Sequence, residues 1–257
     1  MEELGMKIAL DAGHGGVDLG ATYQDRFEKD DNLRLALAVG KLLEDAGNEV
    51  YYTRTEDTYD SPVERARLVN DAEAGLLISF HRNDSTTPNT YTGAEGFIHS
   101  AGGMKARLAE RILNDLGDIG FLNLGVNAYS NDVLLKRTQA PAILLEIGFI
   151  NTEDDNALYD RKFDEIASSI ANSISDSIKQ LSDTHAQTYR VQVGGFTSEL
   201  SAQKVAYHLF QDGYEPVIRK LDENLFVIMV GEIFLLDQAV MLEQFLRILG
   251  YNTMIVS

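Results

Sequence analysis

Three short, buried-looking runs lie far apart in this chain, and each leads into an ionisable residue. They occupy residues 7–10, 76–80 and 142–145. The residues that follow them include His14, His81 and Glu146. Runs of this length, bounded by turn-forming residues, are typical of strands buried in a parallel sheet. Side chains at the carboxyl ends of such strands converge on one crevice, so the pattern predicts an α/β fold with a single site built from three strands.

Two histidines and a glutamate are the residue types that a zinc hydrolase uses. The chain has no cysteine, so disulfides and thiolate zinc sites are excluded and any zinc must be held by nitrogen and oxygen. The residues are too far apart in sequence to share one helix, as the ligands of short zinc motifs do. The hypothesis of a zinc site therefore depends on the strands being neighbours.

The composition is that of an ordinary globular protein. A length of 257 residues with 44% apolar residues predicts one large or two small domains, each with its own core. The formal charge of −18 and the lack of a basic run argue against nucleic acid and anionic membranes as partners. No apolar run reaches the ~18 residues that insertion into a membrane requires. Residues 1–6 also lack the basic-then-apolar pattern of a secretion signal.

The first part of the chain alternates strand and helix patterns, which predicts a mixed, mostly parallel sheet flanked by helices. Ser61 is the expected N-cap of one helix, with Pro62 at its first position. The other expected helices cover residues 30–46, 104–116 and 155–181, and the other expected strands cover residues 49–53 and 94–99. We expect this first domain to span residues 1–181.

A short polar segment, residues 182–187, is the expected linker to a second domain at residues 188–257. The remainder contains two matching halves of strand, helix and strand. The predicted elements are residues 190–193, 198–211, 214–219, 225–230, 235–249 and 252–256. This β-α-β-β-α-β order indicates a small α+β domain of the ferredoxin-like type, fitted for binding more than for chemistry.

Four ordered motifs carry a resemblance to a known family. Residues 11–16, 28–33, 78–83 and 145–151 resemble, in order and spacing, the zinc-dependent N-acetylmuramoyl-L-alanine amidases of the Amidase_3 type. Residues 189–196, with Ser201 and Ala202, resemble the start of a SPOR domain, a module that recognises glycan strands of peptidoglycan. The two resemblances together cover nearly the whole chain.

The resemblance implies a zinc ion (Zn²⁺) on His14, Glu28 and His81, with Glu146 as the catalytic acid/base. It implies cleavage of the amide bond between N-acetylmuramic acid and the L-alanine of the stem peptide. Peptidoglycan, through its glycan strands and stem peptides, is then the expected partner of an enzyme expected to be a monomer. Taken alone, His14 could be a hydrogen-bonded histidine, and Glu28 could be a first-turn acid that favours the helix dipole.

Three further residues lie near the same motifs. Asp11 could orient a metal-bound histidine or could cap a turn. Arg82 and Asn83 could face the substrate, where an arginine could pair with a stem-peptide carboxylate, or could belong to a solvated loop. Arg82 stands where many relatives have a small residue, and the inserted helix that covers the zinc in some relatives has no counterpart in the sequence. His99, His185 and His208 match no ligand position.

An enzyme of the cell wall without a signal peptide would be made in the cytoplasm and released by lysis. Phage endolysins, which leave through holin pores, and sporulation-type autolysins both fit this expectation. Two alternatives remain. One is a catalytically inactive wall-binding protein, and the other is a zinc peptidase or deacetylase acting on the same polymer.

Overall fold

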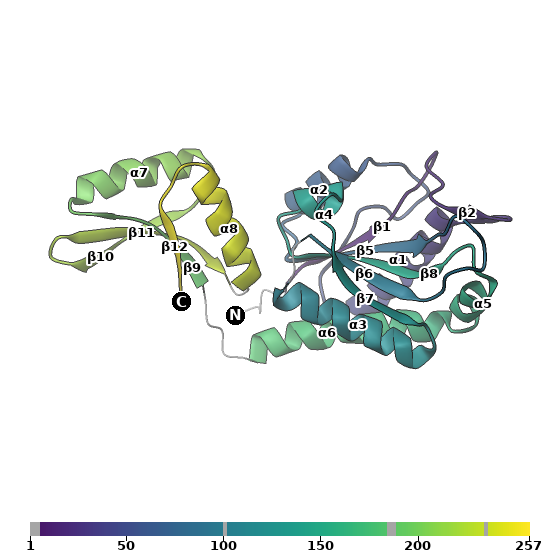
Figure 1. Ribbon diagram of the computed structural model, residues 1–257. Coiled ribbons are helices and arrows are strands. Elements are labelled where there is room, and N and C mark those ends of the chain that lie inside the picture. Colours follow the sequence, from purple (N-terminus) through teal and green to yellow (C-terminus); the bar gives the residue numbers. More distant parts are fainter. Residues whose placement is uncertain (1–5, 100–101, 184–188, 234–235) are drawn as a thin grey trace. The chain divides into compact units, whose positions relative to one another are not determined.

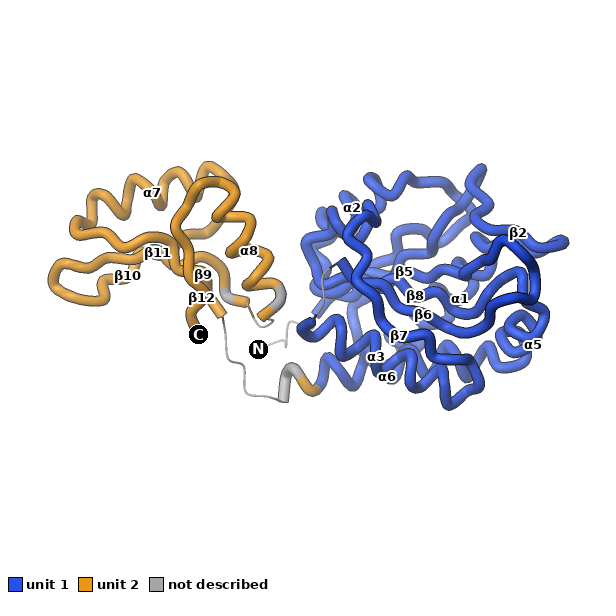
Figure 2. The backbone as a smooth tube through the Cα atoms, in the orientation of Figure 1, with its two compact units in different colours: residues 1–179 blue, residues 180–257 orange. Residues whose placement is uncertain are grey.

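The computed structural model describes residues 6–99, 102–183, 189–233 and 236–257. The chain divides into two compact units, Met1–Lys179 and Gln180–Ser257 (Figure 2). Unit 1 contains all four residues expected at the metal site, and unit 2 contains the expected small α+β domain. The predicted linker, residues 182–187, lies mostly outside the described residues.

Unit 1 is built on a six-stranded sheet with the order β4-β1-β5-β8-β6-β7. Its strands are β1 (Ile8–Ala12), β4 (Val50–Tyr52), β5 (Leu76–Asn83), β6 (Ala94–Ile98), β7 (Asn123–Ala128) and β8 (Ala142–Phe149). The first four strands of this order run parallel, while β6 is antiparallel to β8 and parallel to β7. The predicted mixed, mostly parallel sheet is confirmed.

Helices cover both faces of this sheet (Figure 1). They are α1 (Glu28–Asp45), α2 (Pro62–Asp71), α3 (Gly103–Ile119), α4 (Val133–Arg137), α5 (Glu153–Arg161) and α6 (Phe163–Asp183). One face packs against α2 and α4 through a core cluster of Ala9, Ala66, Val69, Leu77, Leu134, Leu135, Ala142 and Leu144. The other face packs against α3 and α6, together with α1, whose Arg34 guanidinium lies 3.7 Å from the Phe163 ring centroid of α6.

The start of α2 follows from its sequence. The Ser61 hydroxyl accepts a hydrogen bond of 3.2 Å from the Glu64 N–H, and Pro62 occupies the first turn of α2, as expected. Helix α1 begins at Glu28, two residues earlier than the predicted start. The hairpin of β2 (Thr22–Tyr23) and β3 (Arg26–Phe27) leads directly into it, so Glu28 stands at the helix N-terminus.

The prediction of one long helix over residues 155–181 is wrong. Two helices, α5 and α6, replace it, and Lys162 between them has φ −111° and ψ 17°. The Asp155 carboxylate accepts hydrogen bonds from the backbone N–H of Phe149 and Gly93, which fixes α5 against the end of β8. The apolar spacing continues across the break and therefore hides it.

Unit 2 contains β9 (Tyr189–Phe196), α7 (Glu199–Gln211), β10 (Pro216–Asp222), β11 (Leu225–Ile233), α8 (Leu236–Ile248) and β12 (Thr253–Val256). The elements therefore come in the predicted β-α-β-β-α-β order. The strands form an antiparallel sheet of order β10-β11-β9-β12. Both helices pack on one face of it, around Val191, Val193, Ile228 and Val230.

Candidate metal centre

His14, Glu28 and His81 come together at the carboxyl end of β1 and β5. His14 lies in the turn after β1 and adopts a left-handed backbone conformation with φ 62°, which is uncommon for a residue other than glycine. Glu28 is the first residue of α1, and His81 lies near the end of β5. Each offers one potential ligand atom, and these atoms all lie within 4.8 Å of one another.

The glutamate lies between the two imidazole rings. His14 Nε2 is 3.2 Å from Glu28 Oε2, and His81 Nδ1 is 2.9 Å from Glu28 Oε1. The two rings lie 5.0 Å apart and are nearly perpendicular. Glu28 is only 4% exposed, so these contacts are largely shielded from solvent.

Backbone groups and two glycines keep the Glu28 carboxylate in place. Its Oε2 accepts a hydrogen bond of 2.8 Å from the Ala21 N–H, and its Oε1 accepts one of 3.1 Å from the Arg82 N–H. A Cβ atom at Gly13 would lie 2.2 Å from the His81 ring. A Cβ atom at Gly20, whose φ is 66°, would lie 2.5 Å from Glu28 Oε2. The cluster therefore needs glycine at both positions.

The electrostatics of this cluster favour positive charge. Burial by itself would lower the pKa of His14, but hydrogen bonds and charge from Glu28 and Asp18 outweigh burial and raise that pKa to about 9. The pKa of His81 is also raised, because Glu28 and Glu146 outweigh its burial. The pKa of Glu28 is held well below its usual range by the two histidines despite burial. A divalent cation would take the place of the protons on the two rings.

Asp18 is a candidate site residue that the sequence interpretation missed. Its Oδ2 lies 2.9 Å from His14 Nδ1, and its Oδ1 accepts a hydrogen bond of 3.1 Å from the Gly20 N–H. A carboxylate behind a metal-binding histidine fixes the orientation of the ring and its tautomer, here with Nε2 turned toward Glu28. The only signal in the sequence is a carboxylate four residues after His14 in the same glycine-rich loop.

Glu146 lies beside the cluster on β8, in register with His81 of β5. Its Oε2 is buried and has no hydrogen-bond partner among the described residues. Burial is the main reason why the pKa of Glu146 is raised to about 7, and the charge of Glu28 adds to it. A carboxylate with such a pKa can both accept and donate a proton near neutral pH. The nitrogen and oxygen donors and this unpaired oxygen fit a zinc ion with a reacting water.

Asp11 has neither of the two expected roles. It lies within β1 and is fully buried, so it does not cap a turn. Its Oδ2 is 2.6 Å from Arg65 Nη1 and also accepts a hydrogen bond from Ser79, while Oδ1 accepts one from Thr53. No hydrogen bond joins it to either histidine among the described residues. Asp11 instead ties α2 to the sheet beneath the site.

Both expectations for Arg82 are wrong, because its side chain neither faces the substrate nor lies in a solvated loop. The side chain is 1% exposed and forms an ion pair with Asp31. It also donates a hydrogen bond to Asn156 Oδ1, and its guanidinium lies 4.2 Å from the Tyr159 ring centroid. Asn83 is half-buried, and its side-chain oxygen accepts a hydrogen bond from the Asp84 N–H, so its role as a substrate contact stays a prediction.

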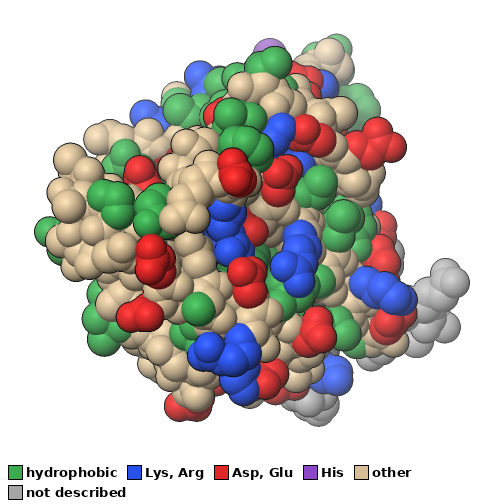
Figure 3. Space-filling model, turned by 90° about the vertical axis from the view of Figure 1, so that its right-hand side faces the viewer, with side chains coloured by type: hydrophobic (Ala, Val, Ile, Leu, Met, Phe, Trp, Pro, Cys, Tyr) green, Lys and Arg blue, Asp and Glu red, His purple; other side chains and the backbone are tan. Residues whose placement is uncertain are grey.

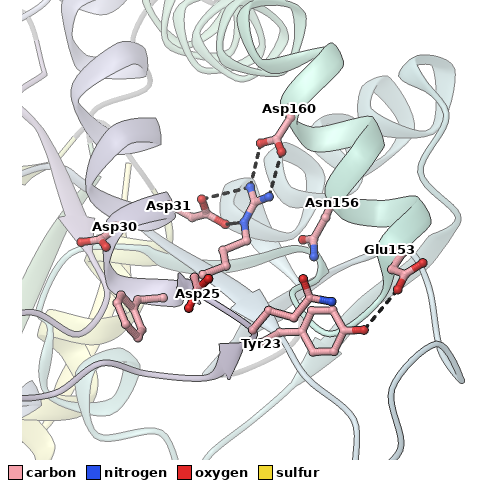
Figure 4. A pocket seen from close by; sticks show the side chains of 10 residues that line it. Tyr23, Asp25, Asp30, Asp31, Glu153, Asn156 and Asp160 are labelled. Atoms are coloured by element: carbon pink, nitrogen blue, oxygen red, sulfur yellow. Dashed lines mark hydrogen bonds and ion pairs between the residues drawn. The ribbon is translucent and has the colours of Figure 1, made fainter.

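A cavity of about 590 Å³ lies between the β2–β3 hairpin, α1 and α5 (Figure 4). None of the three cluster residues lines it. Arg26 reaches across this cavity from β3 and forms ion pairs with Asp31 and Asp160. These two ion pairs of Arg26 fix the β2–β3 hairpin, which leads into Glu28.

Acidic and basic side chains lie interspersed on the face of the molecule in Figure 3.

The two other histidines in the described parts of the chain do not join the cluster. His99 follows β6, and His208 lies in α7 of unit 2. His185 lies outside the described residues. No helix in the described parts of the chain is long and apolar enough to span a membrane.

A mostly parallel sheet with a His–Glu–His cluster at its carboxyl edge, beside an unpaired glutamate, defines a candidate metal-dependent hydrolase. The comparisons with known proteins specify the class further. Residues 8–179 match the family model described as N-acetylmuramoyl-L-alanine amidase. The chain belongs to this family, and its activity is that of a peptidoglycan amidase.

Individual relatives agree with this assignment. A sporulation-specific N-acetylmuramoyl-L-alanine amidase of Bacillus subtilis is 29% identical over 219 residues, which cover 83% of this chain and 84% of that protein. An N-acetylmuramoyl-L-alanine amidase of Bacillus licheniformis is 30% identical, with the same coverage. The crystal structure of an N-acetylmuramoyl-L-alanine amidase from Clostridium difficile 630 is similar with a TM-score of 0.64 and 30% identity, covering 68% of this chain and 97% of that chain.

Proposed function

We propose that this protein is a zinc-dependent amidase that hydrolyses the bond between N-acetylmuramic acid and the L-alanine of the stem peptide. The observation that carries the proposal is the His14, Glu28 and His81 cluster, with ligand atoms within 4.8 Å of one another beside the unpaired Oε2 of Glu146. Zinc, when bound, lowers the pKa of a coordinated water and polarises the substrate carbonyl. Membership of the amidase family supports the choice of bond.

Different residues of the protein have different roles in this reaction. His14, Glu28 and His81 would hold the metal, and Asp18 would orient His14. Glu146 takes the proton of the attacking water and then donates it to the departing nitrogen. An amine is a poor leaving group unless it is protonated, so a carboxyl group with a pKa of about 7 suits the second step.

For unit 2 we propose a ferredoxin-like, SPOR-type module that binds glycan strands. The β10-β11-β9-β12 order and the two helices on one face support this assignment. The face of the sheet away from the helices carries Arg190, Gln192 and the 53% exposed Met254, and is the candidate glycan surface. The alignment with the Bacillus subtilis amidase covers more of this chain than unit 1 contains, so part of unit 2 is shared with that relative.

We propose that the enzyme acts as a sporulation-type autolysin released by lysis of the cell in which it is made. The alignment with the sporulation-specific relative covers more than four fifths of both proteins. This likeness supports a sporulation-type autolysin over a phage endolysin. A test is to measure wall release in a sporulating culture with and without the gene. Wall degradation that is unchanged throughout sporulation would contradict this part of the proposal.

The test of the activity is release of free L-alanine amino termini from purified peptidoglycan by the zinc-loaded protein. Glu146→Ala and a chelated sample serve as controls. We expect release from the intact protein alone. Free termini of another residue would indicate a peptidase, and free sugar amines would indicate a deacetylase. No release from several wall types would favour a protein that only binds the wall.

A further inference from the structure

Polar side chains continue across the sheet beyond Glu146. Glu95 of β6 lies directly opposite Glu146 in the antiparallel pair of β6 and β8. Asn127 of β7 donates a hydrogen bond of 2.8 Å from Nδ2 to Glu95 Oε1. Residues opposite each other on neighbouring strands point to the same face, so His81, Glu146 and Glu95 form one row over three strands. Asn127 lies opposite Phe97, two residues beyond Glu95 on the same face of the sheet.

The outer end of this row, and Asn127 beside it, are open to solvent. Glu95 is half-buried and Asn127 is exposed, although both lie on the face that α2 and α4 cover elsewhere. The second carboxylate oxygen of Glu95 has no partner in the described parts of the chain. Two residues after Asn127, the 49% exposed Tyr129 lies with its ring centroid 5.8 Å from that of Phe97. A ligand extending from Glu146 would therefore meet an acceptor, an amide and an aromatic ring.

The order of these residues across the sheet determines which end of a bound substrate lies at the metal ligands and which end lies at Glu95. The metal ligands lie on one side of Glu146, and Glu95 lies on the other. In the proposed reaction the carbonyl carbon is at the metal and the leaving nitrogen is at Glu146. The group attached to that nitrogen therefore extends away from the metal, over Glu95 and Asn127, while the sugar remains on the metal side.

We propose that Glu95 and Asn127 bind the leaving stem peptide, with the free oxygen of Glu95 accepting a hydrogen bond from a peptide N–H beyond the alanine. The inference rests on the proposed function, because it assigns the two sides of that reaction. Asn127 holds the Glu95 carboxylate through Oε1, which leaves its other oxygen for the ligand. Glu95 is here a substrate-binding residue and takes no part in proton transfer.

The test compares two substrates. One is N-acetylmuramoyl-L-alanine, and the other is the same compound lengthened to four stem-peptide residues. A hydrogen bond to a charged group is worth about ten- to a hundredfold in affinity. For Glu95→Gln and Asn127→Ala we expect kcat/KM on the long substrate to fall about tenfold, mainly through KM, and kcat/KM on the short one to change less than about twofold. The free four-residue peptide should inhibit each variant about tenfold more weakly than it inhibits wild type.

Glu110→Gln is the matched control, because Glu110 is an exposed glutamate on α3, which covers the other face of the sheet. It should leave both substrates and peptide inhibition unchanged. Equal losses on both substrates, or unaltered inhibition by the peptide, would overturn the inference while the amidase reaction stands. If wild type released neither L-alanine from the short compound nor the four-residue peptide from the long one, the proposed function itself would fail. Unfolding midpoints of the variants exclude misfolding as the cause.

Discussion

At the scale of single residues, the His14, Glu28 and His81 cluster depends on a carboxylate that lies behind a histidine ring. Asp18 contacts His14 Nδ1 at 2.9 Å and leaves Nε2 toward Glu28. Asp18→Asn keeps the size of the side chain but removes the charge that stabilises the oriented ring. We expect the dissociation constant for zinc to rise about 10- to 100-fold, measured by competition with a chromophoric chelator.

Asp25→Asn is the control for this change, because Asp25 is exposed in the turn between β2 and β3 and makes no hydrogen bond or ion pair among the described residues. It removes the same charge from the same region. An equal loss of zinc affinity in both variants would mean that general charge, rather than the contact with His14, sets the affinity.

Asp11 provides a prediction about pH and stability. Burial alone would raise its pKa, but Arg65 and hydrogen bonds from Ser79 and Thr53 lower it below the ordinary value of 3.8. A lowered pKa stabilises the fold at pH above that ordinary value, and this stability is lost as the pH falls toward the folded-state pKa. We expect wild type to lose free energy of unfolding below about pH 4.

Asp11→Asn should be destabilised by about 3–5 kcal/mol at pH 7, because it leaves Arg65 buried without its counterion. Its stability should also fall less steeply with acid than that of wild type. Urea unfolding at pH 7, 5 and 3.5 checks both points. The exposed Asp45→Asn should stay within about 0.5 kcal/mol of wild type. Parallel acid profiles for wild type and Asp11→Asn would contradict the assignment.

At the scale of helices and strands, Arg82 connects the end of β5 to α1 and α5. Its guanidinium pairs with Asp31 of α1 and donates to Asn156 of α5, while its N–H donates to Glu28. Arg82→Ala removes one partner from a buried ion pair, and we expect a loss of about 3–5 kcal/mol in the free energy of unfolding. Zinc binding should weaken too, because the end of β5 positions His81.

Arg82→Lys separates the contribution of the positive charge to stability from that of the hydrogen bonds made by the planar guanidinium. Lysine can keep the pair with Asp31 but cannot also reach Asn156 in the same geometry, so its stability should lie between those of wild type and Arg82→Ala. Arg107→Ala, an exposed arginine on α3, should change the stability by less than about 0.5 kcal/mol. Arg82→Ala with the stability of wild type would show that the connection contributes nothing.

Patterns along the chain predicted most elements of the fold, because their causes are local. Continuous apolar runs indicated β1, β5 and β8, and Ser61 with Pro62 indicated the start of α2. Strand β7 could not be found in this way, because Asn123, Gly125 and Asn127 lack the alternation of a half-buried strand. The short helix α4 also lacked a long enough pattern.

The site was predictable only in part. His14, Glu28, His81 and Glu146 follow ordered motifs, and the structure brings them to one edge of the sheet. The burial of Arg82 depends on Asp31 and Asn156, which belong to two different helices. Glu95 lies opposite Glu146 only because β6 runs antiparallel to β8. Such cross-strand neighbours have no counterpart in sequence spacing.

At the scale of the whole molecule, the catalytic chemistry and the proposed glycan binding belong to separate units. The family match ends at residue 179, where unit 1 ends. The match to the solved Clostridium difficile amidase covers 68% of this chain and 97% of that one. A chain of about the length of unit 1 therefore forms the fold by itself. We therefore expect residues 6–183 to fold and to keep the metal site.

The expected consequence is a difference between soluble and insoluble substrates. Residues 6–183 should cleave a soluble muramoyl peptide with kcat/KM within about twofold of the full chain, since the site is complete. On insoluble peptidoglycan they should work about tenfold or more slowly, because a tethered glycan-binding unit raises the local concentration of the catalytic unit at the wall. Adding unit 2 as a separate chain should not restore the rate, because the gain requires a covalent link. Equal rates on insoluble peptidoglycan with and without unit 2 would contradict its role in targeting, whereas a matching loss on the soluble substrate would mean that unit 2 supports the catalytic fold.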